Sequence, residues 1–294
     1  MIENKTVTVR EMIDEAIGFY NKGEWNAAIA SLYLLQGNPK VSVAEDREID
    51  MHLGWNDWKK QNKDMAKSHW LDAISDYYGI LDMDDAKKAS PITKASAHAG
   101  LGIYYAEKGD KEKALYHAKL AQDLLPENAT MNQAMNLNAC GISLAKIGEL
   151  KLAEEVLRKV AKINEQLEKS DDPIIAKKAK HQRAKNGYNL ASLVYFPQKK
   201  WQEAIKELNN EVAPRYVKVG AETDLAAAYH RLSEAYESIE RPGIYKEKPK
   251  LEYALILEEK SLALWQKHPD DPKRIKTAAE NIARIKEKIK NLKQ

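Results

Sequence analysis

The sequence predicts an all-α fold made of antiparallel helix pairs that repeat along the chain. Helix breakers are few, since the 294 residues include only 13 Gly and 10 Pro, whereas the helix formers Ala, Leu, Glu and Lys are abundant. A fixed order of small and aromatic residues also recurs along the chain, as expected for helices that cross closely and stack in series. A single pair cannot bury its apolar face alone, so we expect consecutive pairs to pack on one another.

The clearest repeat unit covers residues 95–128. It predicts a first helix up to Lys108, a tight turn at Gly109, a second helix and a stop at Pro126. We expect Gly102 to lie opposite Ala114, because small residues let two helices approach closely. The ordered positions of this unit are Leu101, Gly102, Tyr105, Gly109, Ala114, Ala118, Ala121 and Pro126.

Looser copies of this order occur near residues 9–42, 47–80, 134–167, 184–218 and 226–268. The order and the unit length of about 34 residues resemble those of the tetratricopeptide repeat family. The resemblance implies an α-α superhelix, or solenoid, of about six antiparallel helix pairs over residues 1–271. Extra residues at 82–94 and 164–182 predict lengthened helices or loops between the units, and Pro242-Gly243 predicts a turn within the sixth.

The last segment, residues 272–294, predicts a basic helix with one apolar stripe. The stripe steps by three and four residues along Ile275, Ala278, Ile282, Ile285, Ile289 and Leu292. Lys and Arg dominate its other faces. We interpret it as a capping helix that covers the open end of the stack, as repeat arrays require. The alternatives are a coiled-coil contact with a second copy of the chain and a patch for an acidic partner or nucleic acid.

The composition argues against several classes of function. The seven histidines lack the spacing of a helical zinc site, and no HExxH, phosphate-binding loop or GxSxG motif occurs, so we predict no metal, no cofactor and no enzyme activity. The lone Cys140 precludes an internal disulfide and is predicted to be a buried, inert thiol. The net charge of +3 argues against a whole-molecule attraction to nucleic acid. No apolar run reaches the roughly 18 residues of a membrane span, and we expect a cytoplasmic protein.

Candidate binding residues follow from the family resemblance, which implies that the first helix of each pair lines a concave groove. The implied groove residues include His52, Trp55, Asn138, Lys185, Tyr188, Asn189, His230 and Arg231. An amide such as Asn189 can hydrogen-bond to a peptide backbone, and Arg231 can donate two parallel hydrogen bonds to a carboxylate. This set partly resembles the carboxylate clamp of chaperone-binding members of the family, but Ile142 stands at a position where the clamp is polar. Trp55 is interpreted either as a groove anchor or as packing between repeats, and Trp70 as core.

The sequence therefore predicts a non-catalytic scaffold that binds a protein or peptide in its groove, with no small-molecule substrate. The alternative is a structural or adaptor subunit that acts through its convex face, the segments 82–94 and 164–182, and the basic terminal helix. A third hypothesis, an enzyme with a helical fold, requires paired carboxylates in a closed cavity.

Overall fold

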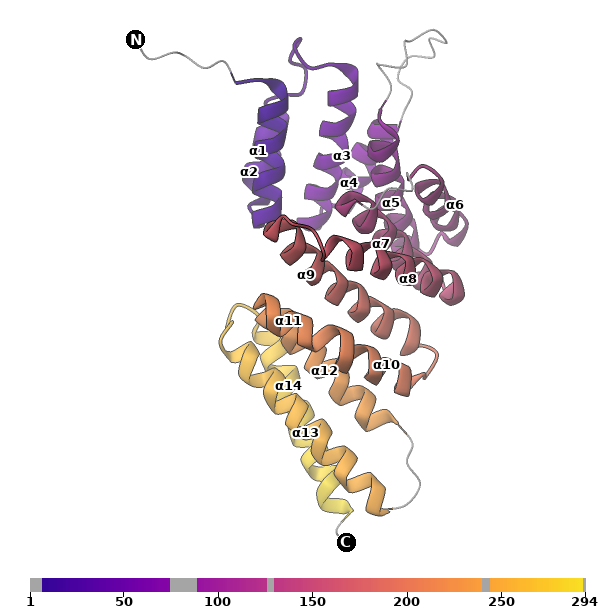
Figure 1. Cartoon of the computed structure of the whole chain (residues 1–294), viewed down its shortest axis with the longest axis vertical. Helices are drawn as coiled ribbons and strands as arrows, with labels where there is room; N and C mark the ends of the chain where they lie inside the picture. The colour runs from indigo at the N-terminus through magenta and orange to yellow at the C-terminus, as the bar shows by residue number, and fades with distance from the viewer. Residues whose placement is uncertain (1–6, 75–88, 126–129, 240–243, 293–294) are drawn as a thin grey trace, which may run out of the picture. The chain divides into compact units, whose positions relative to one another are not determined.

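A computed structural model describes residues 7–74, 89–125, 130–239 and 244–292 of the chain. All regular elements within these residues are helical, and consecutive helices pack in pairs (Figure 1). The prediction of an all-α chain of helix pairs is therefore confirmed. The contacts divide the described chain into two compact units, residues 7–125 with 139–148 and residues 130–138 with 149–292. Helix α7 (Met131–Lys146) contributes its first half to unit 2 and its second half to unit 1.

Unit 1 contains three helix pairs. Side-chain caps begin several of its helices, with Thr8 and Ser42 forming capping boxes and Asp110 accepting from the backbone of Lys113. Gly23 and Gly109 end the leading helices of two pairs with positive φ values of 81° and 79°, which glycine adopts without strain. The pairs are α1 (Val9–Lys22) with α2 (Trp25–Tyr33), α3 (Val43–Lys59) with α4 (Lys63–Ile74), and α5 (Pro91–Lys108) with α6 (Lys111–Asp123).

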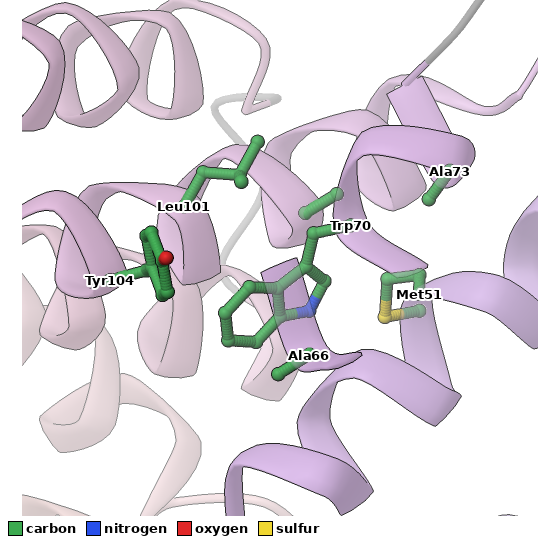
Figure 2. Close-up of a cluster of buried hydrophobic side chains, with 7 residues drawn as sticks. Met51, Ala66, Trp70, Ala73, Leu101 and Tyr104 are labelled. Carbon is green, nitrogen blue, oxygen red and sulfur yellow. The ribbon is translucent and has the colours of Figure 1, made fainter. Parts of the chain in front are cut away.

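Trp70 of α4 is fully buried, as predicted. Its indole lies among Met51, Ala66 and Leu101 (Figure 2). Gly54 of α3 and Gly100 of α5 both face this ring, and a Cβ added to either would lie within 2.5 Å of an indole atom. The two glycines thus make room for one large side chain between successive helix pairs.

The predicted crossing of α5 and α6 at Gly102 is also present. A Cβ at this position would meet the carbonyl oxygen of Ala114 at 3.6 Å and the amide nitrogen of Ala118 at 3.5 Å. The backbones approach closely at this point because all three residues are small.

Unit 2 also consists of packed helices, which range from short segments of five to seven residues to the 23 residues of α13. Helix α9 begins at Pro173, where the carboxylate of Asp172 accepts hydrogen bonds from the backbone of Ile174 and Ile175. Much of the segment 164–182 is therefore helical rather than an extended loop. The elements are α8 (Leu150–Leu167), α9 (Pro173–Asn189), η2 (Leu190–Tyr195), α10 (Trp201–Glu207), η3 (Leu208–Val212), α11 (Ala213–Val219), α12 (Glu222–Ser238), α13 (Ile244–Gln266) and α14 (Pro272–Asn291).

Two short π-helical segments, η2 and η3, interrupt the α-helical geometry of unit 2. The backbone of Phe196 donates to the carbonyl of Ala191 at 3.0 Å, which is the five-residue spacing of a π-turn. Segment η3 packs against α9, and η2 packs against α10. Segment η2 follows α9 and η3 follows α10, so each π-helical segment packs against the α-helix that precedes the other.

The terminal helix α14 packs its apolar stripe on α13. Ile285 is fully buried against Leu251 and Ala254, and Ile289 and Leu292 pack at the edge of the same cluster. The stripe is thus used inside the chain, while the Lys-rich faces of the helix point to solvent. No helix among the described residues is both long and apolar enough to cross a membrane.

Candidate functional site

Two of the predicted groove residues meet side chain to side chain in unit 2. The amide nitrogen of Asn189, at the end of α9, donates to the amide oxygen of Asn138 on α7 at 3.1 Å. Both side chains are half-buried, and among the described residues neither the Asn138 Nδ2 nor the Asn189 Oδ1 has another hydrogen-bond partner. The pair therefore presents one donor and one acceptor side by side, which matches the two polar groups of a peptide bond.

Arg231 of α12 lies beside Tyr188, the residue that precedes Asn189. Its guanidinium contacts the Glu234 carboxylate at 2.6 Å and stacks 5.3 Å from the Phe196 ring centre. Burial lowers the pKa of Arg231, but the charge interactions with Glu234 and Tyr188 outweigh it and raise that pKa overall. The predicted carboxylate-binding cation is thus held between an aromatic ring and a carboxylate from its own helix.

His230, the other residue predicted on α12, belongs to a more buried ion pair. Its Nδ1 lies 2.9 Å from the carboxylate of Glu258 on α13, whose side chain is almost completely buried. Asn281 of α14 donates to the same carboxylate at 3.3 Å. Three successive helices therefore meet at Glu258, and this contact positions the α12 face.

The exposed face of α9 continues from the amide pair toward the beginning of that helix. Lys185 is exposed on this face, one turn before Asn189, and His181 contacts the Asp224 carboxylate of α12 at 2.7 Å. At the first turns of α9 the face ends in an open cavity of about 610 Å³. The cavity is lined by Pro173, Ile174, Lys177, Lys178, His181, Val219 and Ala221.

The two predicted residues of unit 1 have local partners. His52 lies 3.8 Å from Glu48 on the same helix, and this neighbour together with the hydrogen bonds from Arg10 lowers the pKa of Glu48 to about 2. The indole of Trp55 donates to Ser96 of α5 at 2.9 Å and packs edge-on against Trp70. Trp55 therefore joins two successive helix pairs, which is the packing alternative considered for it.

Several residues of the unit 2 site were not predicted from the sequence. Phe196, Glu258 and Asn281 reach the predicted residues from the end of a π-helical segment, from α13 and from α14. These three have no local sequence signal, whereas Glu234 follows Arg231 by three residues on one helix. The cavity was missed as well, although Ile174, Lys177 and His181 share the helical spacing of Lys185 and Tyr188.

Among the described residues, no cluster of three or more His, Cys, Asp or Glu side chains could hold a metal ion. Cys140 is buried, and burial raises the pKa of its thiol to about 12, so the reactive thiolate is scarce at neutral pH. The lining of the α9 cavity includes no carboxylate.

Comparisons with known proteins identify the fold through structure and not through sequence. No protein-family model matches the chain, and no curated protein matches it. A Rap protein solved in complex with competence and sporulation factor superposes with a TM-score of 0.59 at 12% identity, covering 99% of this chain and 79% of the Rap chain. The structure of BtubC from P. vanneervenii gives a TM-score of 0.53 at 15% identity, covering 86% of this chain and 92% of BtubC.

A third similar structure comes from a larger protein. It is a signal transduction ATPase with a tetratricopeptide repeat sensor from Pyrococcus horikoshii, with a TM-score of 0.57 and 14% identity. The match covers 93% of this chain and 41% of the ATPase, so this chain spans less than half of that protein. At these identities the likeness concerns the fold. The chain has the fold of tetratricopeptide repeat proteins.

Proposed function

We propose that the chain is a non-catalytic binding module that holds an extended segment of a partner protein or peptide on the unit 2 face. The observation that carries the proposal is the pair of side-chain amides at Asn138 and Asn189, joined at 3.1 Å with one donor and one acceptor unused. A peptide bond placed over this pair accepts from Asn138 and donates to Asn189. Such backbone recognition does not depend on the ligand's side chains.

Neighbouring groups give the same face a means of side-chain selection. Tyr188 and Phe196 provide aromatic surface, and Arg231, which interacts with both, provides a cation. Glu234 neutralises part of the charge of Arg231, so a ligand carboxylate has to compete with an intramolecular partner. The face therefore favours ligands that place an apolar or hydrogen-bonding side chain next to the peptide bond bound by the amide pair. Ligands that offer only a terminal carboxylate are less favoured.

The structural comparisons support a binding role of this kind. A Rap protein of the same fold has been solved in complex with competence and sporulation factor, and another similar structure contains a tetratricopeptide repeat sensor. The combination of a binding fold with an unused amide pair is what favours this function over an enzymatic one.

The test compares partners captured from the native cell by the wild-type chain and by Asn189→Ala and Arg231→Ala variants. Asn132→Ala is the matched control, because Asn132 is an exposed asparagine on α7 outside the amide pair. Two lost hydrogen bonds weaken binding by about 1–3 kcal/mol, or roughly 5- to 150-fold, so partners of the proposed face are depleted only in the first two variants. Equal capture by all four folded proteins would show that the named face is not the binding surface.

The adaptor function remains the second candidate, and the exposed cations of α14 favour it. Lys273, Lys276 and Lys290 point to solvent because the apolar stripe of the helix packs on α13. Removing α14 would uncover this buried stripe, so replacing the three lysines with Glu is the cleaner test. Partners that are lost in this variant but kept by Asn189→Ala would support the adaptor function.

A further inference from the structure

The exposed face of α9 connects the amide pair to the open cavity near the beginning of the helix. Ile174, Lys177, His181, Lys185 and Tyr188 follow one another at steps of three or four residues, which places them on one side of an α-helix. At a rise of 1.5 Å per residue, the positions of Ile174 and Asn189 are about 22 Å apart. An extended chain of about seven residues covers that distance.

The cavity is suited to an apolar side chain. Pro173, Ile174, Val219 and Ala221 supply most of its lining, and the aliphatic stems of two lysines complete it. Ile174 is 76% exposed, so its aliphatic surface faces solvent beside the cavity. A ligand that covers Ile174 would remove this apolar surface from water.

The charges along the face between the cavity and the amide pair are mainly positive. Lys177 and Lys185 are exposed and, among the described residues, have no ion pair. Among the described residues, the Asp224 carboxylate is already bound to His181 at 2.7 Å, and the Asp172 carboxylate accepts from the backbone of Ile174 at the start of α9. Acidic side chains therefore complement the face, whereas a basic segment would be repelled.

We propose that the ligand of this face is an acidic, extended peptide segment that places an aliphatic or aromatic side chain in the α9 cavity. Its backbone then runs along α9, past Lys177 and Lys185, to the amide pair about seven residues away. This inference rests on the proposed function, because it assumes that Asn138 and Asn189 hold the other part of the same segment. The cavity and the lysines select the sequence, and the amides hold the backbone.

The experiment pans a displayed library of random dodecapeptides against the full chain and measures the affinity of synthetic copies of the enriched peptides. The variants are Ile174→Glu, Asn189→Ala and a Lys177→Gln/Lys185→Gln double variant. Ile175→Glu is the matched control, because Ile175 is also an exposed aliphatic residue of the same turn but does not line the cavity. Circular dichroism and thermal unfolding confirm that each variant is folded.

We expect enriched peptides to carry acidic residues and one large apolar residue. Their affinity should fall about tenfold or more with Ile174→Glu and remain unchanged with Ile175→Glu. Replacing the apolar residue of the peptide with Ala should reduce its affinity for the wild-type chain by a similar factor. The Ile174→Glu change should then have no further effect on the affinity of that peptide. The double lysine variant should weaken binding and reduce its dependence on salt.

Two other results overturn the inference in distinguishable ways. Peptides whose binding is lost with Asn189→Ala but is unaffected by Ile174→Glu would refute the cavity as an anchor site and leave the proposed function standing. The absence of any enriched peptide, or enrichment of peptides insensitive to both variants, would refute both proposals.

Discussion

The imidazole of His230 and the buried carboxylate of Glu258 lie 2.9 Å apart, and they join the exposed face of α12 to the interior of α13. Burial lowers the pKa of His230, but the hydrogen bond and the charge of Glu258 outweigh this effect and raise that pKa overall. Folding therefore favours protonation of His230 relative to the unfolded chain. His230, which was predicted to contact a ligand, therefore also joins α12 to α13 beneath the proposed binding face.

Because of this pair, we expect the unfolding free energy to decrease as the pH rises above about 6.5. Because the folded pKa of His230 exceeds the unfolded value of about 6.5, its contribution to stability is complete below that pH. The contribution is lost as the pH rises through the folded pKa. We expect the unfolding free energy to decrease over this range in denaturant titrations. Glu258→Gln should reduce this dependence, since among the described residues only the Glu234 carboxylate at 3.6 Å then remains beside His230, and should destabilise the chain by about 1–3 kcal/mol. An unchanged slope in that variant would contradict the assignment.

Unit 1 contains a histidine pair with the opposite response to pH. The Nδ1 atoms of His98 and His117 lie 2.9 Å apart, and burial, with nearby positive charge from lysines, lowers the pKa of each ring to about 4. The neutral pair stabilises the fold fully above about pH 6.5, and its contribution is lost as the pH falls from 6.5 through 4. The melting temperature should fall over this window, and less steeply in His98→Gln. Ring resonances that titrate near pH 6.5 in the native protein would contradict this prediction.

The glycines around Trp70 should tolerate no side chain. A Cβ on Gly100 would lie 2.3 Å from the indole, and one on Gly54 would lie 2.4 Å from it. We expect Gly54→Ala and Gly100→Ala to lower the unfolding free energy by roughly 1–3 kcal/mol through overpacking. Gly18→Ala in α1 is the control, since nothing lies within 4 Å of its Cβ position and the change should stabilise that helix by about 0.5–1 kcal/mol. Equal effects at Gly18 and Gly100 would argue against the packing described.

Release of Arg231 from its intramolecular partner should increase affinity for acidic ligands. The Glu234→Gln change removes the carboxylate 2.6 Å from the guanidinium but preserves the shape of the side chain. We expect peptides with an acidic residue opposite Arg231 to bind roughly two- to fivefold more tightly, as for a half-exposed ion pair. Matched peptides with Gln at that position are the control and should not respond. Fluorescence anisotropy at low and high salt measures the affinities of the acidic peptides and of their Gln controls.

The thiol of Cys140 should react only when its surroundings open. With a pKa of about 12 and complete burial, the thiolate fraction at pH 8 is about one in ten thousand. Labelling by a chromogenic disulfide should therefore be at least a hundredfold slower in buffer than in denaturant, and its rate should follow the unfolding equilibrium. Rapid labelling of the folded chain would show that the thiol is accessible.

The parts of the fold that the sequence could predict depend on local patterns. Gly102 opposite Ala114, the buried Trp70 and the apolar stripe ending at Leu292 each follow from residue size and helical spacing. The candidate site was predicted in part for the same reason, since Asn138 and Asn189 were placed by their register within two repeats.

The remaining parts depend on contacts that no local pattern encodes. Glu258 reaches His230 from another helix, and a buried carboxylate looks like any other glutamate in the sequence. The family's unit length also suggested that the fifth unit begins near residue 184, whereas α9 begins at Pro173 and carries the cavity in the added turns. The five-residue hydrogen bond of Phe196 has no sequence signature at all.

The π-helical segment η2 sets the direction of the side chains that follow it. A π-turn accommodates one residue more than an α-turn, so every side chain after Leu190–Tyr195 is rotated by about 100° relative to an uninterrupted helix. Phe196 directly follows this segment and stacks on Arg231. Deletion of one residue from η2 would therefore turn Phe196 away from Arg231 without altering any amino acid of the proposed site.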